Sequence, residues 1–199
     1  MKVVTAIENF VPDPETEEIT VFLAGGITNC WDWQKFVIEY LKEKEKEGED
    51  LSRMVIFNPR RPNFPIDDPF AAYAQIEWEY KQLMACDIFS MYFAGGSSIQ
   101  PICMYELGRY SYRMDNLFPW DYQNRVIVTV EPTYKRVSDV VIQMQLAFGP
   151  YSQIVYRDNA AHVNAVTATI HADRIIRSYK KILKRYAKIE EEVKDYGSV

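Results

Sequence analysis

The sequence alternates short apolar runs with longer amphipathic segments, and this alternation limits the fold more than any other feature. Five runs have the composition of buried strands: 19–24 (ITVFLA), 53–57 (RMVIF), 88–93 (IFSMYF), 125–130 (RVIVTV) and 153–156 (QIVY). Segments with apolar residues at helical spacing follow them, at 32–47, 70–85, 101–113, 138–148 and 164–196. The order predicts an α/β protein with a doubly wound, mostly parallel five-stranded sheet in a flavodoxin- or Rossmann-like three-layer sandwich, ending in a long C-terminal helix.

The length and charge of the chain limit its organisation and its partners. A chain of 199 residues is long enough for one good core. We expect an N-terminal extension over 1–18, one α/β domain over 19–163, and a C-terminal helical extension of that domain over 164–199. The formal net charge of -5 argues against a nucleic acid polymer as partner, since such proteins show a basic face.

Cysteine usage and hydropathy predict where the protein resides. Cys30, Cys86 and Cys103 have neither disulfide-framework nor metal-ligand spacing, which suits free thiols in a reducing compartment. The N-terminus lacks an apolar leader, and no apolar run is long enough to span a bilayer. We therefore expect a cytoplasmic protein with no membrane partner. No metal is expected either, because no cluster of histidine, cysteine and acidic residues has ligand spacing.

The loops that follow the predicted strands are the expected ligand site. In a doubly wound sheet, ligands bind at the carboxyl ends of the strands, so the loops at 25–26, 58–69 and 95–100 should converge. Glu106 comes shortly after the last of these loops, in the segment GGSSIQPICMYELGRY. It is a candidate active-site residue, although a solvated glutamate near a helix N-terminus is the competing interpretation.

Four segments together resemble the nucleoside 2-deoxyribosyltransferase-like family: FLAGGI, NPRR, QIEWEYKQLMACDIF and GGSSIQPICMYELGRY. The likeness covers roughly residues 19 to 157. It implies that Glu106, in the ELG segment, attacks the sugar carbon of a nucleoside and forms a covalent glycosyl-enzyme ester. Glu79 matches the acid that protonates the departing base. Glu77, two residues earlier on the helix, is its competitor, and only one of the two can face the site.

The other candidate substrate-binding residues each have a structural alternative. Gly25 and Gly26 fit either a tight turn or a close backbone approach to a ligand. Arg60 is either a solvated charge or a fork for a phosphate or a base edge. Asp87 fits a structural hydrogen bond as well as a ligand contact. The loop also supplies Ser97 and Ser98, whose hydroxyls suit sugar or phosphate oxygens or turn chemistry.

Gln100 departs from the family pattern. It stands six residues before Glu106, where the transferases of the family commonly carry an aspartate and the nucleotide hydrolases tend to have a serine nearby. Transferase and hydrolase activity therefore both remain open, as do the base, the sugar and the phosphorylation of the substrate.

The resemblance implies an N-glycosidic enzyme of nucleotide salvage that acts on a nucleoside or nucleotide without a cofactor. It also implies a homo-oligomer, a dimer or larger, because active sites in this family are often completed by a neighbouring subunit. Two other functions stay open: a nucleotide-binding module without chemistry, and an NAD glycohydrolase.

Overall fold

A computed structural model describes residues 1–11, 17–65, 67–117, 125–148, 154–156 and 162–168. Its strands are β1 (Lys2–Thr5), β2 (Ile19–Gly25), β3 (Met54–Asn58), β4 (Ile88–Phe93), β5 (Val126–Val130) and β6 (Ile154–Tyr156). Its labelled helices are α1 (Trp33–Lys46), α2 (Pro69–Ala85), α3 (Pro101–Leu117) and α5 (Val137–Phe148). Each of these follows a strand, so the alternating order predicted from the sequence is confirmed.

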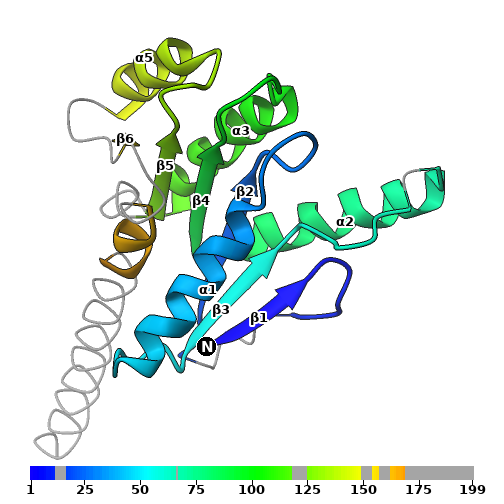
Figure 1. Ribbon diagram of the computed structural model, residues 1–199, viewed down its shortest axis with the longest axis vertical. Helices are drawn as coiled ribbons and strands as arrows, with labels where there is room; N and C mark the ends of the chain where they lie inside the picture. The colour runs from blue at the N-terminus through cyan, green and yellow to red at the C-terminus, as the bar shows by residue number, and fades with distance from the viewer. Residues whose placement is uncertain (12–16, 66, 118–124, 149–153, 157–161, 169–199) are drawn as a thin grey trace, which may run out of the picture.

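The strands form one sheet in the order β1-β3-β2-β4-β5-β6, and every described pairing is parallel. The chain moves outward from β2 to β3, then crosses back to β4 on the other side of β2, which makes the sheet doubly wound. The α/β doubly wound prediction is therefore confirmed. Figure 1 shows the strands pointing toward a common edge, where the ligand loops lie.

β1 adds a sixth strand, in the segment that the sequence predicts to be an N-terminal extension. It pairs with β3, from Lys2 opposite Val55 to Thr5 opposite Asn58, and has no second neighbour among the described strands. A four-residue edge strand shows too short a pattern to be separated from a loop. The division of the chain at residues 18 and 163 stays a prediction. Of the long C-terminal helix, only a helical stretch over 162–168 lies within the described residues.

Two apolar clusters cover the two faces of the sheet. Val21 and Leu23 of β2 pack in the cluster that contains Trp33 and Leu41 of α1. Phe22 and Ala24 point the other way, toward a cluster of residues from α2, α3 and α5. In Figure 1, α1 lies in front of the sheet and α2 and α3 lie behind it. Because both faces are covered, the strands are apolar throughout rather than alternating.

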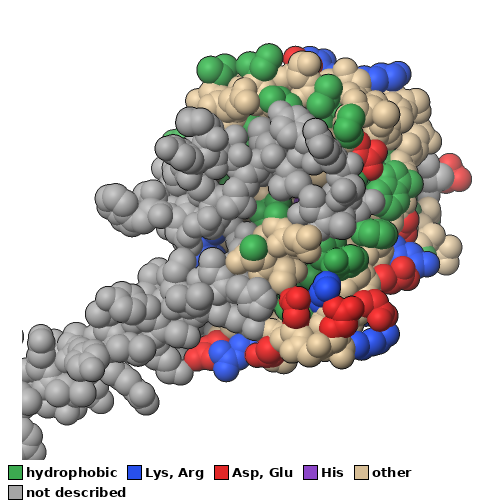
Figure 2. All heavy atoms as spheres, turned by 60° about the vertical axis from the view of Figure 1, so that its left-hand side comes forward, with side chains coloured by type: hydrophobic (Ala, Val, Ile, Leu, Met, Phe, Trp, Pro, Cys, Tyr) green, Lys and Arg blue, Asp and Glu red, His purple; other side chains and the backbone are tan. Residues whose placement is uncertain are grey.

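The ends of the helices follow from local chemistry. The Asp32 carboxylate caps α1 by accepting from the Lys35 N–H at 3.0 Å, and Asp68 caps α2 by accepting from the Phe70 N–H at 2.9 Å. α1 ends in a charged stretch with ion pairs from Lys44 to Glu47 and from Lys46 to Glu43. Figure 2 shows acidic and basic side chains intermixed in the lower part of the described surface.

His162 ties the described helical stretch to the middle of the sheet. Its ring is fully buried and lies 2.8 Å from the Ser90 hydroxyl on β4 and 2.7 Å from the Thr129 hydroxyl on β5. Burial lowers the pKa of His162 to about 3, so the ring is neutral at physiological pH. The ring therefore has a structural role, joining this helical stretch to β4 and β5.

Among the described residues, no helix is long and apolar enough to cross a membrane.

Candidate active site

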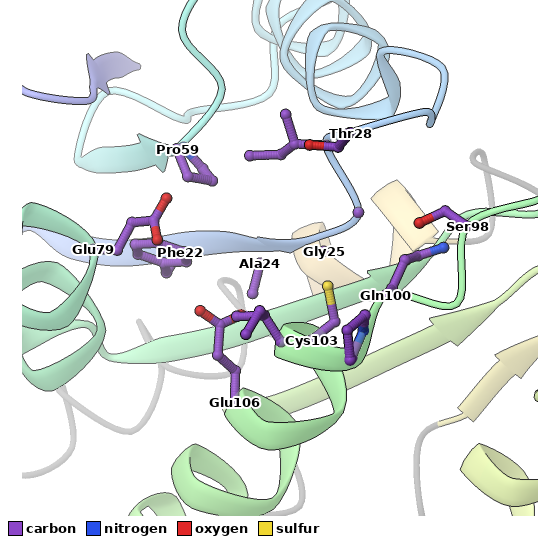
Figure 3. Close-up of a pocket in the computed structure, with 14 residues that line it drawn as sticks. Phe22, Ala24, Gly25, Thr28, Pro59, Glu79, Ser98, Gln100, Cys103 and Glu106 are labelled. Carbon is purple, nitrogen blue, oxygen red and sulfur yellow. The ribbon is translucent and has the colours of Figure 1, made fainter. Parts of the chain in front are cut away.

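A pocket lies at the carboxyl edge of the sheet, between β2 and β4. At this point the strand order reverses, because β3 is added on one side of β2 and β4 on the other. Open α/β sheets bind ligands at such a switch point. Its walls come from the ends of β2 and β3, from α2, and from the loop that leads into α3 (Figure 3). The lining residues are Phe22, Ala24, Gly25, Gly26, Ile27, Thr28, Pro59, Glu79, Ser98, Gln100, Pro101, Ile102, Cys103 and Glu106.

Glu106 reaches the pocket from the second turn of α3. Its side chain is half-buried against the apolar end of β2. Burial, and secondarily the charge of Glu79, raise the pKa of Glu106 to about 8. In the free pocket this carboxyl group therefore keeps its proton at pH values well above the usual pKa of glutamate.

Glu79 reaches the same pocket from α2, on the other side of Phe22 (Figure 3). Burial raises the pKa of Glu79, and a hydrogen bond from the Gln75 side-chain amide partly offsets this effect. Glu77 turns outward, where its carboxylate is exposed and pairs with Lys81 at 2.7 Å. Of the two glutamates that the sequence left in competition, Glu79 is thus the one that lines the pocket.

The two carboxyl groups form an electrostatically coupled pair. Each is raised in pKa by burial, and the charge of Glu79 adds to the shift of Glu106. Two acids in one partly desolvated site titrate together, so over a range of pH the pair holds a single proton. Such a pair provides one proton donor and one anionic nucleophile or base.

The two glycines after β2 are required by close contacts within the protein. Gly25 has a φ of +151°, and a side chain there would collide with the Tyr92 carbonyl of β4. A Cβ atom on Gly26 would lie 2.5 Å from both the Cys30 sulfur and the Gln100 side-chain oxygen. Both glycines also line the pocket, so their backbone is open to a ligand on one side and crowded on the other.

The loop between β4 and α3 contributes Ser98 and Gln100. Ser98 lines the pocket, whereas Ser97 is exposed and lies outside the lining. Gln100 is buried, and its amide donates to the Ala94 carbonyl at 2.7 Å. Gln100 directly precedes Pro101, the first residue of α3. Its φ of 45° is unusual for a residue other than glycine.

Besides Ser97, two further sequence candidates, Arg60 and Asp87, lie outside the pocket lining. The Arg60 guanidinium donates to Gln34 at 2.9 Å and to the Trp31 carbonyl at 3.0 Å, so it holds the loop after β2. Asp87 lies at the amino end of β4, opposite to the ligand edge. Its carboxylate accepts from both the N–H and the hydroxyl of Thr20 at 2.9 Å, which is the contact expected of its structural alternative.

Several residues that line the pocket could not be identified from the sequence. Ile27 and Thr28 follow the glycines directly, and Pro59 is the first residue after β3, but nothing in their residue types suggests a ligand. Cys103 also lines the pocket. Burial raises the pKa of its thiol to about 12, so it stays protonated and unreactive.

Among the described residues, no group of three histidine, cysteine or acidic side chains is placed to hold a metal ion.

Residues 18–118, just over half of the chain, match a protein-family model described as nucleoside 2-deoxyribosyltransferase like. The match contains β2 to α3 and therefore every residue that lines the pocket. No curated protein matches the chain in sequence.

Proposed function

Because the chain belongs to the nucleoside 2-deoxyribosyltransferase-like family, we propose that it is an enzyme that cleaves the N-glycosidic bond of a nucleoside, a deoxynucleoside or its monophosphate. The reaction passes through a covalent ester between the sugar and Glu106, and the sugar is then transferred to another base or to water. The observation that carries this proposal is the pair Glu79 and Glu106, which reach one pocket from two different helices.

The pair supplies the two groups that the first half-reaction needs. A carboxylate oxygen of Glu106 forms a bond to the anomeric carbon while the bond from that carbon to the base nitrogen breaks. The electron pair of the broken bond stays on the base, which takes a proton from Glu79. In the free pocket Glu106 holds the proton of the pair up to a pH of about 8. When the substrate binds, this proton must pass to Glu79, so that Glu106 attacks as the anion.

The second half-reaction reverses these roles. Glu79, now ionised, accepts a proton from water or from the nitrogen of an incoming base. The oxygen or nitrogen that loses this proton attacks the anomeric carbon, and the ester bond to Glu106 breaks. Burial raises the pKa of Glu79, which suits a carboxyl group that must first give and then take up a proton.

The site also suggests how the substrate is held. Ser98 offers a hydroxyl to the sugar, and the backbone at Gly25 and Gly26 allows a close approach. The only charged side chains of the lining are the two glutamates, so a neutral nucleoside suits the described pocket better than a dianionic monophosphate. We place the activity in nucleotide salvage in the cytoplasm.

A substrate panel tests the proposal. The protein is incubated with deoxynucleosides, ribonucleosides and their monophosphates, with and without a second base, and free and exchanged bases are separated by chromatography. We expect base release or exchange that is lost in Glu106→Ala. Release of nicotinamide from NAD alone would favour an NAD glycohydrolase. Tight nucleotide binding without turnover, unchanged in Glu106→Gln, would favour a binding module.

We also propose a homo-oligomer. Support comes from an apolar surface beside the pocket mouth, formed by α2 and the start of α3. Phe70, Tyr73 and Ile76 of α2 are 84%, 70% and 65% exposed, and Ile102 and Tyr105 of α3 are 65% and 62% exposed. The Arg109 guanidinium lies 5.0 Å from the centre of the Tyr80 ring, which joins the two helices on this side. Large exposed apolar side chains on two neighbouring helices favour a protein–protein contact, because apolar patches on a surface tend to mark interaction sites.

A further inference from the structure

Gln75 lies one helical turn before Glu79 on α2, so both side chains project from the same side of the helix. The residue is 9% exposed. Its side-chain nitrogen donates two hydrogen bonds of 2.7 Å, one to the Pro59 carbonyl and one to Oε1 of Glu79. A single amide thus links the candidate acid to the loop that follows β3.

The Pro59 carbonyl fixes the orientation of this amide. A carbonyl oxygen can only accept, so the nitrogen of Gln75 must face it. One N–H of the amide then points at Pro59 and the other at Glu79 Oε1. A carboxylic acid accepts better at its carbonyl oxygen than at its hydroxyl oxygen, so this bond to Oε1 favours the proton of Glu79 on the other oxygen, Oε2.

We propose that Gln75 is a positioning residue that sets which oxygen of Glu79 carries the transferable proton and strengthens Glu79 as an acid. This inference rests on the proposed function. The N–H of Gln75 bonds more strongly to a carboxylate than to a carboxylic acid. It therefore stabilises Glu79 increasingly as the proton passes to the departing base.

The effect of Gln75 on the pKa of Glu79 agrees with this role. Burial raises it, and the hydrogen bond from Gln75 opposes the rise. Without Gln75, Glu79 would be a weaker acid, and its carboxyl group would be free to rotate. Both changes slow protonation of the base, whereas neither removes a contact to the substrate.

Gln75→Met tests the inference, because methionine keeps the unbranched shape and removes the amide. Gln82→Met is the matched control: Gln82 lies on the same helix, is 5% exposed, and donates to the Phe10 carbonyl at 3.1 Å, away from Glu79. We expect kcat to fall roughly tenfold or more in Gln75→Met with KM nearly unchanged, and to stay near the wild-type value in Gln82→Met. If Gln75→Met does not fold, Gln75→Leu replaces it.

A second substrate separates acid catalysis from general damage. An N7-methylated purine nucleoside releases its base as a neutral molecule and needs little help from an acid. Gln75→Met should cleave it at close to the wild-type rate. An equal loss on both substrates would contradict a role through the proton of Glu79.

A measurement without turnover keeps this inference apart from the proposed function. Carbon-13 NMR titration of the glutamate carboxyl groups, with Glu79→Gln used for assignment, should show a higher pKa of Glu79 in Gln75→Met than in the wild type. An unchanged pKa overturns the role of Gln75 whatever the activity. A raised pKa in a protein that turns over no substrate would instead contradict the proposed function alone.

Discussion

Among single residues, Glu106 is both the proposed nucleophile and a buried carboxyl group whose ionisation lowers the stability of the fold. Its pKa is raised to about 8, mainly by burial. The unfolded chain holds this group near its usual value of 4.5, so the folded state binds the proton more tightly. The contribution of Glu106 to stability is therefore complete below pH 4.5 and is lost as the pH rises through 8.

Glu106→Gln should remove this penalty. We expect the variant to be more stable than the wild type at pH 8.5, by about 1 to 2 kcal/mol after allowance for solvent at a half-buried carboxyl, and equally stable at pH 4.5. Thermal unfolding at both values of pH measures the difference. Glu39→Gln serves as control, because its carboxylate is 62% exposed. A difference between wild type and Glu106→Gln that does not depend on pH would show that burial does not shift Glu106.

At the scale of elements, the loop between β2 and α1 is held from two sides. Arg60 donates to the Gly26 carbonyl at 3.3 Å and pairs with Asp32 at 3.2 Å. On the other side, the Trp31 indole donates to Glu131 at 3.0 Å, at the end of β5. The loop carries Ile27 and Thr28 into the pocket wall, so Arg60 bears on the site through the loop it holds.

Arg60→Lys should loosen this loop, because an ammonium group cannot reproduce several planar N–H contacts at once. We expect KM to rise roughly tenfold, with a smaller effect on kcat and an equal effect on a nucleoside and on its monophosphate. Steady-state kinetics on both substrates separate the positioning of the loop by Arg60 from direct binding of a phosphate. A rise in KM confined to the monophosphate would mean that Arg60 binds phosphate directly. Arg61→Lys is the neighbouring control.

Apart from β1, the elements were predictable from the sequence, because each of the other strands is a continuous apolar run and each labelled helix has an apolar stripe. All five predicted strands and the four labelled helices are present within a few residues of their expected bounds. The contacts across the site were not predictable in the same way. Gln75 and Arg60 act through hydrogen bonds to backbone carbonyls, and no residue pattern shows where a carbonyl will lie in space.

Asp87 shows the opposite case, in which a polar residue beside a strand looks functional. It precedes β4, so it lies at the edge of the sheet away from the pocket, and it bonds to Thr20 on the neighbouring strand β2. The sequence position alone fits either role. The direction of β4 distinguishes the structural role from the ligand contact, because it puts Asp87 at the edge of the sheet away from the pocket.

For the whole molecule, the exposed apolar side chains of α2 and α3 form the interface of the proposed homo-oligomer. We expect light scattering coupled to size exclusion to give the mass of a dimer or larger assembly for the wild type, and a smaller mass for Ile76→Glu. Leu146→Glu, which changes an equally apolar residue of α5 that is 76% exposed, should leave the mass unchanged. A monomeric wild type would contradict the homo-oligomer, and dissociation by Leu146→Glu alone would move the interface to α5.

The most direct test of the account is the covalent intermediate itself. The protein is mixed with a deoxynucleoside that it turns over, quenched in acid within the first turnovers, digested and examined by mass spectrometry. We predict that the peptide containing Glu106 gains the mass of the sugar residue, and that Glu106→Ala shows neither the adduct nor turnover. Turnover in Glu106→Ala, or an adduct on any other residue, would contradict the assignment of Glu106 as the nucleophile.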